Sequence, residues 1–213
     1  MKFGKYEDQL IRLRTKDGLD LQGFAAAFCS SYGLSEFGRE KESIKLEGYQ
    51  IFEGEIDTIE MLGIKRVIKQ FCELTPYELY AAMKLRVDAF VVEQQCPYEE
   101  LDNRDQEAIH LWLEEADGIQ AYLRVLKPGV EADCFAIGRV VSAKRGRGLA
   151  RMILEEGISY IEDEFDARRI YLEAQTYARG LYEKAGFRQI SEEFLLDGIP
   201  HIRMIRESSL QKE

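Results

Sequence analysis

The chain has 213 residues, of which 46% are hydrophobic and 32% are charged, and its net charge is −10. This length allows one large domain or two small ones, and the composition supports a packed core rather than a disordered chain. The acidic balance argues against general binding to nucleic acid, because an average surface of this charge repels a phosphate backbone. A local basic patch could still bind a small anion.

The four cysteines are irregularly spaced, and no two lie close enough in sequence to form a metal-binding pair: Cys29, Cys72, Cys96 and Cys134. The N-terminus has no signal-peptide pattern, and no hydrophobic stretch reaches the length of a membrane span. We therefore expect a reduced cytoplasmic protein that has no metal and does not associate with a membrane.

Residues 1–63 give the weakest pattern. Apolar residues after Asp17 predict a short helix that ends near Tyr32, and the segment Ser43–Glu60 predicts short strands or an irregular cover. This part of the chain contains no group of residue types that suggests catalysis. It is predicted to be a small α+β extension, either a separate mini-domain or a cap on the rest of the chain.

The pattern becomes clearer from Ile64 onward. Ile64–Leu74 is predicted to be a strand, and Thr75 and Glu78 flank a proline in the arrangement of a helix capping box. Apolar residues then recur at helical spacing, which predicts a helix with one buried face: Leu79, Met83, Val87 and Phe90.

The remaining segments predict a mixed sheet flanked by helices, an α/β (α+β) fold. A helix from Leu149 to Phe165 connects two predicted strands, which implies a right-handed parallel crossover. Hairpins on either side imply antiparallel neighbours, with turns at Ala116–Gly118 and at Asp197-Gly198. The predicted strands are Ile109–Leu113, Ala121–Leu126, Ala136–Val141, Ile170–Ala174, Phe187–Leu196 and Ile199–Arg206, with a short helix at Arg179–Ala185.

The segment 137–150 runs from a strand through a glycine-rich, basic turn (residues 144–148, called the basic turn below) into a helix. The start of a helix presents unpaired N–H groups and a partial positive charge, so this arrangement can bind an anion. Gly146 and Gly148 allow a phosphate to approach the backbone closely. Positive charge comes from three side chains of the same turn: Lys144, Arg145 and Arg147.

A solvated surface turn is the alternative interpretation of this segment. The sequence matches neither the G-x-G-x-x-G dinucleotide fingerprint nor the Gly-Lys-Ser/Thr of a Walker loop. Instead, Arg145-Gly146-Arg147-Gly148-Leu149-Ala150 resembles the R/Q-x-x-G-x-G/A motif of the GNAT acyltransferases, and Gly180–Phe187 resembles their segment with a tyrosine followed by Gly-Phe. Further segments resemble the ElaA-like branch of that superfamily: Phe90–Tyr98, Ile137–Val140, Leu172–Gln175 and Asp197–Ile202.

The resemblance covers about residues 64–206 and leaves residues 1–63 outside it. It implies a GNAT fold over residues 64–207, preceded by the extension 1–63 and followed by a tail, 208–213. It also implies acetyl-CoA as co-substrate, with no metal. Its pyrophosphate would bind the backbone amides of six residues: Arg145, Gly146, Arg147, Gly148, Leu149 and Ala150.

The resemblance further implies that the pantetheine arm lies beside the strand Ile137–Val141. A backbone N–H at Val140 or Val141 would then stabilise the negative charge that forms on the thioester oxygen. Tyr182 corresponds to the family's general acid, which protonates the departing thiolate. A phenol with a pKa of about 10 is protonated at neutral pH and suits this role. The alternative is a tyrosine that only packs between helix and sheet.

The acceptor amine must lose a proton before it can attack, and three residues are candidates for the base: Glu93, Glu173 and His201. Histidine titrates in the useful range, but a lone histidine is more often structural. The only other histidine, His110, is a weaker candidate. Cys96 is expected to be structural, because the family transfers the acyl group directly.

The function that this resemblance implies is acetyl transfer from acetyl-CoA to a primary amine. The acidic surface is compatible with a polyamine, an aminoglycoside, or a lysine or N-terminus of a protein. Two alternatives stay open: a sensor that binds acyl-CoA without turnover, and an interaction protein whose basic turn meets an acidic partner. A homodimer is a further expectation.

Overall fold

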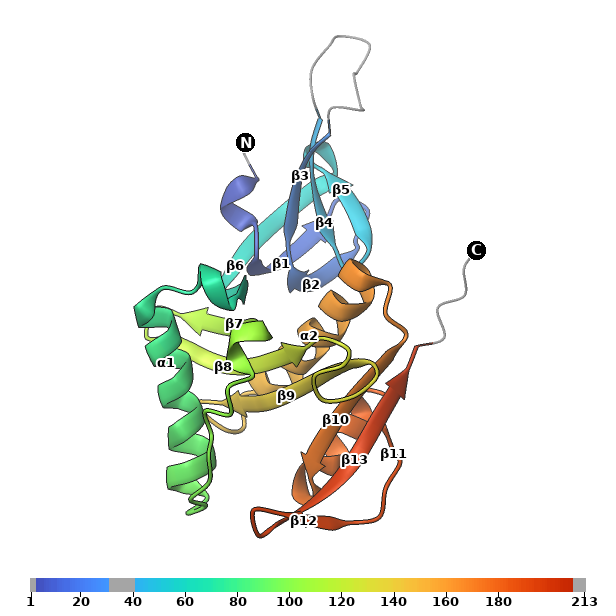
Figure 1. The fold of residues 1–213 in the computed structure, drawn as a ribbon. Coiled ribbons are helices and arrows are strands. Elements are labelled where there is room, and N and C mark those ends of the chain that lie inside the picture. The colour runs from blue at the N-terminus through green and yellow to red at the C-terminus, as the bar shows by residue number, and fades with distance from the viewer. Residues whose placement is uncertain (1–2, 31–40, 209–213) are drawn as a thin grey trace. The chain divides into compact units, whose positions relative to one another are not determined.

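The computed structural model describes residues 3–30 and 41–208 of the chain (Figure 1). The chain divides into two compact units. One contains the residues up to Val67 together with Glu114–Asp117, and the other contains Ile68–Leu113 and the chain from Gly118 onward. The boundaries 1–63, 64–207 and 208–213 expected from the sequence remain a prediction.

The described residues of the first unit form strands and short 3-10 turns. One antiparallel group has the order β6-β1-β2, and a second sheet has the order β3-β4-β5. Their bounds are β1 Gln9–Thr15, β2 Asp20–Phe24, β3 Ala26–Ser30, β4 Lys41–Leu46, β5 Tyr49–Phe52 and β6 Ile56–Gln70, with η1 at Gly4–Tyr6 and η2 at Glu53–Glu55. The core consists of apolar residues from η1, β1, β4, β5 and the β2–β3 link: Phe3, Tyr6, Ile11, Leu13, Ala25, Ile44, Leu46 and Ile51.

The prediction of a helix after Asp17 is wrong, because this segment forms β2 and β3. Leu21 of β2 lies opposite Leu13 of β1 and packs on the core of this unit. Asp20 accepts hydrogen bonds from Arg12 and pairs with a second arginine of β1. These contacts join different parts of the chain, so helical spacing within one segment cannot reveal them. The predicted end of the helix at Tyr32 lies outside the described residues, whereas the strands expected within Ser43–Glu60 are confirmed.

The second unit contains a mixed sheet with the strand order β11-β13-β10-β9-β8-β7, and β12 pairs with β13. The strands are β7 Ile109–Glu115, β8 Gly118–Leu126, β9 Phe135–Ser142, β10 Arg169–Gln175, β11 Arg188–Gln189, β12 Phe194–Leu196 and β13 Ile199–Glu207. The helical elements are η3 Phe71–Glu73, α1 Pro76–Arg86, η4 Val87–Glu93, η5 Asp105–Glu107, α2 Leu149–Phe165, η6 Thr176–Ala178 and α3 Arg179–Lys184. The parallel pairing of β9 with β10 confirms the predicted crossover through α2.

Helices α1 and α2 cover opposite faces of this sheet. Leu123 of β8 faces α2, where a Cβ added at Gly157 would lie 2.7 Å from its Cδ2. The neighbouring Tyr122 faces the other way, and the guanidinium of Arg86 at the end of α1 lies 5.7 Å from its ring centroid. Since successive side chains of a strand point to opposite faces, the two contacts place the helices in separate layers.

Local signals in the sequence predicted the start of α1 well. Thr75 Oγ1 accepts a hydrogen bond from the Glu78 amide at 3.2 Å, and the Glu78 carboxylate accepts one from the Thr75 amide at 2.8 Å. The preceding strand ends at Gln70 rather than Leu74, because Phe71–Glu73 forms the 3-10 turn η3. The predicted strand Phe187–Leu196 is also interrupted, and only its two ends, β11 and β12, pair with β13.

Strands β9 and β10 pair over only a short distance. Their register joins Ile170 to Phe135 and Tyr171 to Ala136, after which the strands diverge (Figure 1). The rest of the β9 edge on this side, from Ile137 to Ser142, therefore has backbone groups that β10 does not pair. No helix among the described residues is long and apolar enough to cross a membrane.

Candidate active site

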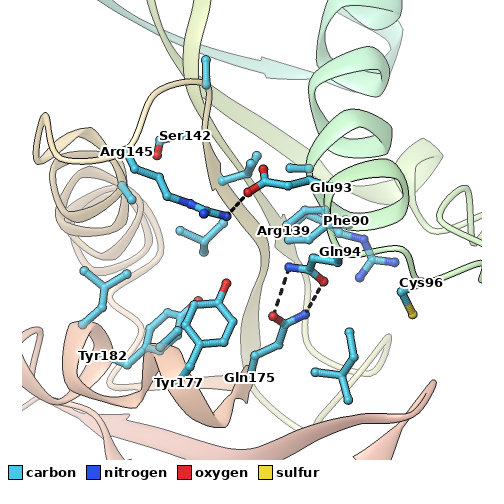
Figure 2. Close-up of a pocket in the computed structure, with 18 of the residues that line it drawn as sticks. Phe90, Glu93, Gln94, Cys96, Arg139, Ser142, Arg145, Gln175, Tyr177 and Tyr182 are labelled. Atoms are coloured by element: carbon cyan, nitrogen blue, oxygen red, sulfur yellow. Dashed lines mark hydrogen bonds and ion pairs between the residues drawn. The ribbon is translucent and has the colours of Figure 1, made fainter.

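A cleft of about 630 Å³ opens where β9 and β10 diverge (Figure 2). The walls come from β9, the basic turn, the start of α2, the end of η4, the end of β10 and the start of α3. Most of the site residues predicted from the sequence line this cleft: Glu93, Val140, Val141, Arg145, Gly146, Gly148, Leu149, Ala150, Glu173, Tyr182 and His201. Arg147 does not line the cleft. Its Nη1 instead donates a hydrogen bond to Gln120 Oε1 at 3.4 Å.

The basic turn leads directly into the N-terminus of α2. Gly146 and Gly148 adopt left-handed conformations with φ of +82° and +76°, and no neighbouring atom lies within 4 Å of an added Cβ at either position. Gly148 is the N-cap residue of α2, and no side chain caps the first N–H groups of this 17-residue helix. The turn therefore presents open space and the positive end of a helix dipole to the cleft, and no side chain caps the first turn of α2.

Strand β9 contains a bulge beside the cleft. Gly138 lies opposite Arg124 and Val141 lies opposite Tyr122, so Arg139 and Val140 together face a single residue of β8. Arg139 has a φ of +57°, a conformation that costs a non-glycine residue about 1 kcal/mol or more. A bulge leaves an extra residue outside the ladder and changes the direction of its backbone groups. In the sequence, Gly138 was the single hint of this irregularity.

Tyr182 lies in α3 with 8% of its surface exposed, and its ring packs edge-on against Phe187. Burial, and to a smaller degree the neighbouring Tyr177, raise the pKa of Tyr182 above its ordinary value. The phenol therefore stays protonated throughout the neutral range. Tyr177 also lines the cleft and stands beside Tyr182 in Figure 2, and it was not among the residues predicted from the sequence.

Glu93 ends the π-helical segment η4, which continues α1. Its carboxylate forms an ion pair with Arg145 of the basic turn, across the mouth of the cleft (Figure 2). Both side chains are more than half exposed. An exposed pair of this kind contributes little stability and exchanges readily for another partner.

A second pair joins the residue after η4 to the end of β10. Gln94 and Gln175 exchange two hydrogen bonds of 3.1 and 3.0 Å between their amide groups. The sequence showed Gln175 only as part of a polar strand face and did not predict this pairing, which joins residues far apart in the chain. Cys96 is buried nearby, and its thiol donates to the Asp197 carbonyl at 3.3 Å.

Glu173 and His201 differ in how their polar atoms are used. Glu173 Oε1 accepts hydrogen bonds from the Tyr171 hydroxyl at 2.8 Å and from Arg203 Nε at 3.1 Å. His201 Nδ1 lies 2.8 Å from the Ile199 carbonyl oxygen. Because a carbonyl can only accept, Nδ1 must carry the proton, which leaves Nε2 of the neutral ring with a lone pair.

Comparisons with known proteins agree with this geometry. Residues 78–208 match the model of the acetyltransferase (GNAT) domain. The chain belongs to the GNAT acetyltransferase family. It is 40% identical over 147 residues to a UPF0039 protein of Mycobacterium bovis, which covers 66% of this chain and 92% of the relative. It is 34% identical over 139 residues to protein ElaA of Escherichia coli, which covers 63% and 91%.

Solved structures confirm the GNAT fold and its ElaA-like character. The crystal structure of an acyl-CoA N-acyltransferase from Pseudomonas aeruginosa is similar with a TM-score of 0.64 and 39% identity, over 67% of this chain and 99% of that one. The crystal structure of E. coli ElaA is similar with a TM-score of 0.63 and 32% identity, over 68% and 99%. GNAT proteins are acyltransferases that use acyl-CoA as co-substrate.

The cleft of this GNAT protein fits a ligand that carries a diphosphate and a narrow arm. The open turn around Gly146 and Gly148 leaves amide groups at the start of α2 without a side-chain cap, and such groups bind phosphate oxygens. The unpaired β9 edge offers N–H and C=O groups to an extended arm. Among the residues that the structure describes, no group of His, Cys, Asp and Glu is arranged to hold a metal ion.

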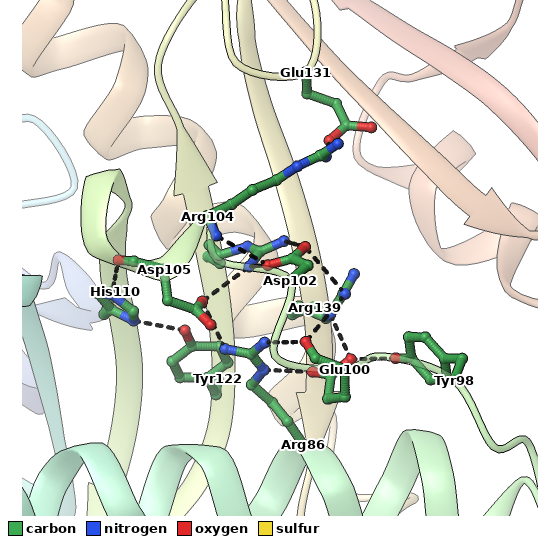
Figure 3. Close-up of polar contacts among 11 residues, drawn as sticks. Arg86, Tyr98, Glu100, Asp102, Arg104, Asp105, His110, Tyr122, Glu131 and Arg139 are labelled. Atoms are coloured by element: carbon green, nitrogen blue, oxygen red, sulfur yellow. Dashed lines mark hydrogen bonds and ion pairs between the residues drawn. The ribbon is translucent and has the colours of Figure 1, made fainter.

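A ring of buried and partly buried charges includes one residue of the β9 bulge (Figure 3). Three arginines and three carboxylates alternate in it, and we call it the charged ring: Arg86, Glu100, Arg139, Asp102, Arg124 and Asp105. Consecutive members contact each other at 2.6 to 3.3 Å. The ring was not predicted from the sequence, although Arg124 and Arg139 interrupt otherwise apolar strands, which is a signal that could have been used.

The arginines of the ring lower the pKa values of two of its carboxylates, Asp102 and Asp105. Burial alone would raise the pKa of Asp102, but the hydrogen bonds and charge of Arg124, together with Arg139, lower it to about 2. Burial opposes the ionisation of Asp105 in the same way, yet Arg86 and Arg124 lower its pKa. The ring contains as many arginines as carboxylates, so each arginine has carboxylate partners within it.

His110 lies next to the charged ring and not in the cleft. Its Nε2 lies 3.0 Å from the Asp105 carbonyl and its Nδ1 lies 2.7 Å from the Tyr122 hydroxyl. The carbonyl can only accept, so Nε2 donates, and burial lowers the pKa of the ring, which favours the neutral form in which Nδ1 accepts from the Tyr122 hydroxyl. This arrangement gives His110 a structural role and removes it from the candidates for the base.

Proposed function

We propose that this protein transfers an acetyl group from acetyl-CoA to a primary amine by direct attack. The observation that carries the proposal is the cleft between β9 and β10. It has an anion-binding turn at one end, and a buried tyrosine and a histidine with a fixed tautomer also line it. Acetyl-CoA supplies an activated acyl group as a thioester, and the chain's own groups bind, orient and exchange protons.

The basic turn is proposed to hold the diphosphate. The amides of residues 145–150 and the dipole of α2 act on its oxygens, while Lys144 and Arg145 add positive charge beside it. Arg145 would exchange its ion pair with Glu93 for one with phosphate, because the exposed Glu93 carboxylate competes weakly for it. This exchange leaves the Glu93 carboxylate open toward the amine side of the cleft.

The β9 edge is proposed to hold the acyl end. A backbone N–H at Val140 or Val141 donates to the oxygen that gains negative charge as the amine attacks. The bulge supports this role, because it takes Arg139 and Val140 out of the regular ladder with β8.

His201 is proposed to accept the proton of the amine. Its Nδ1–H is held by the Ile199 carbonyl, so Nε2 is the basic atom of a neutral ring that lines the cleft. Glu173 is less suited, since Tyr171 and Arg203 both donate to one of its oxygens. Glu93 is paired with Arg145 unless phosphate takes that partner.

Tyr182 is proposed to protonate the departing thiolate as general acid. Burial raises the pKa of its hydroxyl, which therefore stays protonated in the neutral range. A general acid with these properties contributes about 10²–10⁴-fold to a rate.

The test measures release of the free CoA thiol from acetyl-CoA in the presence of a panel of amines: spermidine, an aminoglycoside, a lysine peptide and a peptide with a free N-terminus. We expect turnover with at least one of them, and Tyr182→Phe to lower kcat by about 10²-fold or more with little change in acetyl-CoA affinity. Binding of acetyl-CoA without thiol release for any amine would instead support the sensor. A Tyr182→Phe variant with full kcat would contradict the assigned acid.

The base is tested by the kinetics of single variants with the best amine. We expect His201→Asn to lower kcat by about 10²-fold or more, whereas Glu173→Gln and Glu93→Gln keep most of the activity. Full activity in His201→Asn, together with a large loss in Glu173→Gln or Glu93→Gln, would transfer the role to that carboxylate.

A further inference from the structure

The charged ring has one member on the wall of the cleft. Arg86, Arg124 and the carboxylates Glu100 and Asp105 are all at most 5% exposed, whereas Arg139 lies on β9 and lines the cleft. The ring therefore connects the interior of the GNAT unit with the strand that faces the acyl end of the ligand.

Arg139 is held from several sides. Its Nε lies 2.7 Å from Glu100 Oε2, and its Nη2 lies 3.3 Å from Asp102 Oδ2 and 3.5 Å from the Glu100 carbonyl oxygen. The guanidinium also lies 5.7 Å from the ring centroid of Tyr98, whose hydroxyl donates to Glu100. These partners come from the loop between η4 and η5, so the side chain is fixed to a different element from the one that carries its backbone.

The partners of Arg139 are themselves immobile. Glu100 Oε1 accepts from Arg86 Nε at 2.6 Å, and both Asp102 oxygens accept from Arg124 at 2.7 Å. Each contact is charge-assisted, and the geometry at Asp102 is bidentate. A group held this firmly can fix the direction of the backbone that it is attached to.

The backbone of Arg139 needs such a support. Its φ of +57° is unfavourable for a residue with a Cβ, and the bulge leaves it without a regular ladder partner on β8. On the other side, β10 pairs with β9 only at Phe135 and Ala136. Neither β8 nor β10 therefore forms regular backbone pairs with β9 at Arg139. The next amide, that of Val140, needs another support to keep its orientation.

We infer that Arg139 is a positioning residue, which the charged ring holds so that the bulge in β9 directs the Val140 amide into the cleft. The inference rests on the proposed function, because it is this amide that would donate to the oxygen of the acyl group. Arg139 does not act on the substrate itself. Its role is to keep the donor in place before the substrate binds, which lowers the reorganisation needed during the reaction.

The first experiment observes the amide directly. Backbone NMR spectra of the wild type are compared with saturating CoA and with acetonyl-CoA, a stable ketone analogue of acetyl-CoA. We expect the Val140 amide proton to move downfield with acetonyl-CoA relative to CoA, and this difference to disappear in Arg139→Gln. The matched control Arg104→Gln removes the same charge from an arginine that pairs with Glu131 outside the charged ring, and should keep the difference.

The second experiment separates positioning from folding. For each variant, kcat is divided by the number of sites that bind CoA, so that unfolded protein does not count. We expect Arg139→Gln to lower this kcat by about 10²-fold with the CoA Kd changed less than about 3-fold, as for loss of one oxyanion donor. Arg139→Lys keeps the charge but not the planar guanidinium. Its kcat per binding site should lie between those of the wild type and Arg139→Gln.

Three outcomes overturn the inference. They are a Val140 shift that persists in Arg139→Gln, a kcat per binding site that equals the wild type, and a wild-type Val140 amide that does not distinguish acetonyl-CoA from CoA. If Arg139→Gln does not fold, the same two measurements on Arg139→Lys, together with the wild-type spectra, still test the inference. Failure of the proposed function gives a different pattern, in which no amine is acetylated although the Val140 shift is present and depends on Arg139.

Discussion

The cleft and the charged ring use the same kinds of groups but hold them differently. At the cleft mouth, Arg145 and Glu93 are 78% and 52% exposed and make one ion pair. In the charged ring, the side chain of Arg86 has no exposed surface and contacts two carboxylates. Exposure makes the first pair weak and exchangeable, while burial makes the second network costly to open. In the proposed roles, the same kinds of charged groups serve ligand binding where the pair can exchange and alignment of the backbone where it cannot.

The largest expected effect comes from opening the charged ring. Arg86→Met removes one cation and leaves Glu100 with only Arg139, and Asp105 with only Arg124, as a charged partner. Breaking a buried pair in this way costs about 3–5 kcal/mol, which urea unfolding followed by circular dichroism would measure. A decrease of less than about 1 kcal/mol in the free energy of unfolding would show that water or neighbouring groups replace the arginine. The charged ring would then be no harder to open than the exposed pair at the cleft mouth.

The next effect concerns the ligand rather than the fold. Gly148→Asp places a side chain with a negative charge at a left-handed position in the basic turn. Acetyl-CoA at 100 times its Kd should stabilise the wild type by about 2.7 kcal/mol and the variant hardly at all, as measured by thermal melting. Arg104→Gln serves as the control and should retain the full shift. Equal stabilisation of both proteins would place the diphosphate elsewhere.

Acid should weaken the charged ring through Asp102. Its pKa in the folded protein is lowered to about 2, compared with about 3.9 in the unfolded chain. The contribution of this carboxylate to stability is therefore complete above about pH 4 and is lost as the pH falls toward 2, by about 1 kcal/mol after allowance for partial exposure. Unfolding free energies measured between pH 5 and pH 2.5 should show a smaller decline in Asp102→Asn than in the wild type.

The smallest effect on stability should come from the cleft mouth. Glu93→Gln removes the exposed ion pair with Arg145 and should change the free energy of unfolding by less than about 0.5 kcal/mol. The same change should tighten acetyl-CoA binding slightly, because Arg145 no longer has a competing carboxylate. Urea unfolding and calorimetric titration test the two statements, and a clear weakening of acetyl-CoA binding would contradict the proposed exchange.

Features encoded by neighbouring residues could be predicted from the sequence. The capping box at Thr75, the basic turn before α2 and the hairpin at Asp197 each depend on a few consecutive residues, and all three are present. The motifs also led to the correct family, and most residues chosen from them line one cleft. Their chemical roles remain predictions.

Features that depend on distant parts of the chain were missed or wrong. The helix expected after Asp17 failed because β2 pairs with β1. The charged ring joins α1, a loop and two strands, and the Gln94–Gln175 pair joins residues 81 positions apart. Helical or alternating periodicity describes one segment at a time, so it contains no information on which polar groups of different segments will meet.

The π-helical segment Val87–Glu93 has a consequence for sequence changes in this part of the chain. A π turn accommodates one residue more than an α turn. Deletion of a single residue there would convert the wide turn into a regular one, and Glu93 and Gln94 would keep nearly the same direction around the helix axis. Deletion of a single residue from the regular part of α1 would instead rotate both side chains by about 100°. The π turn therefore marks the position along this helix where a change of length disturbs the cleft wall least.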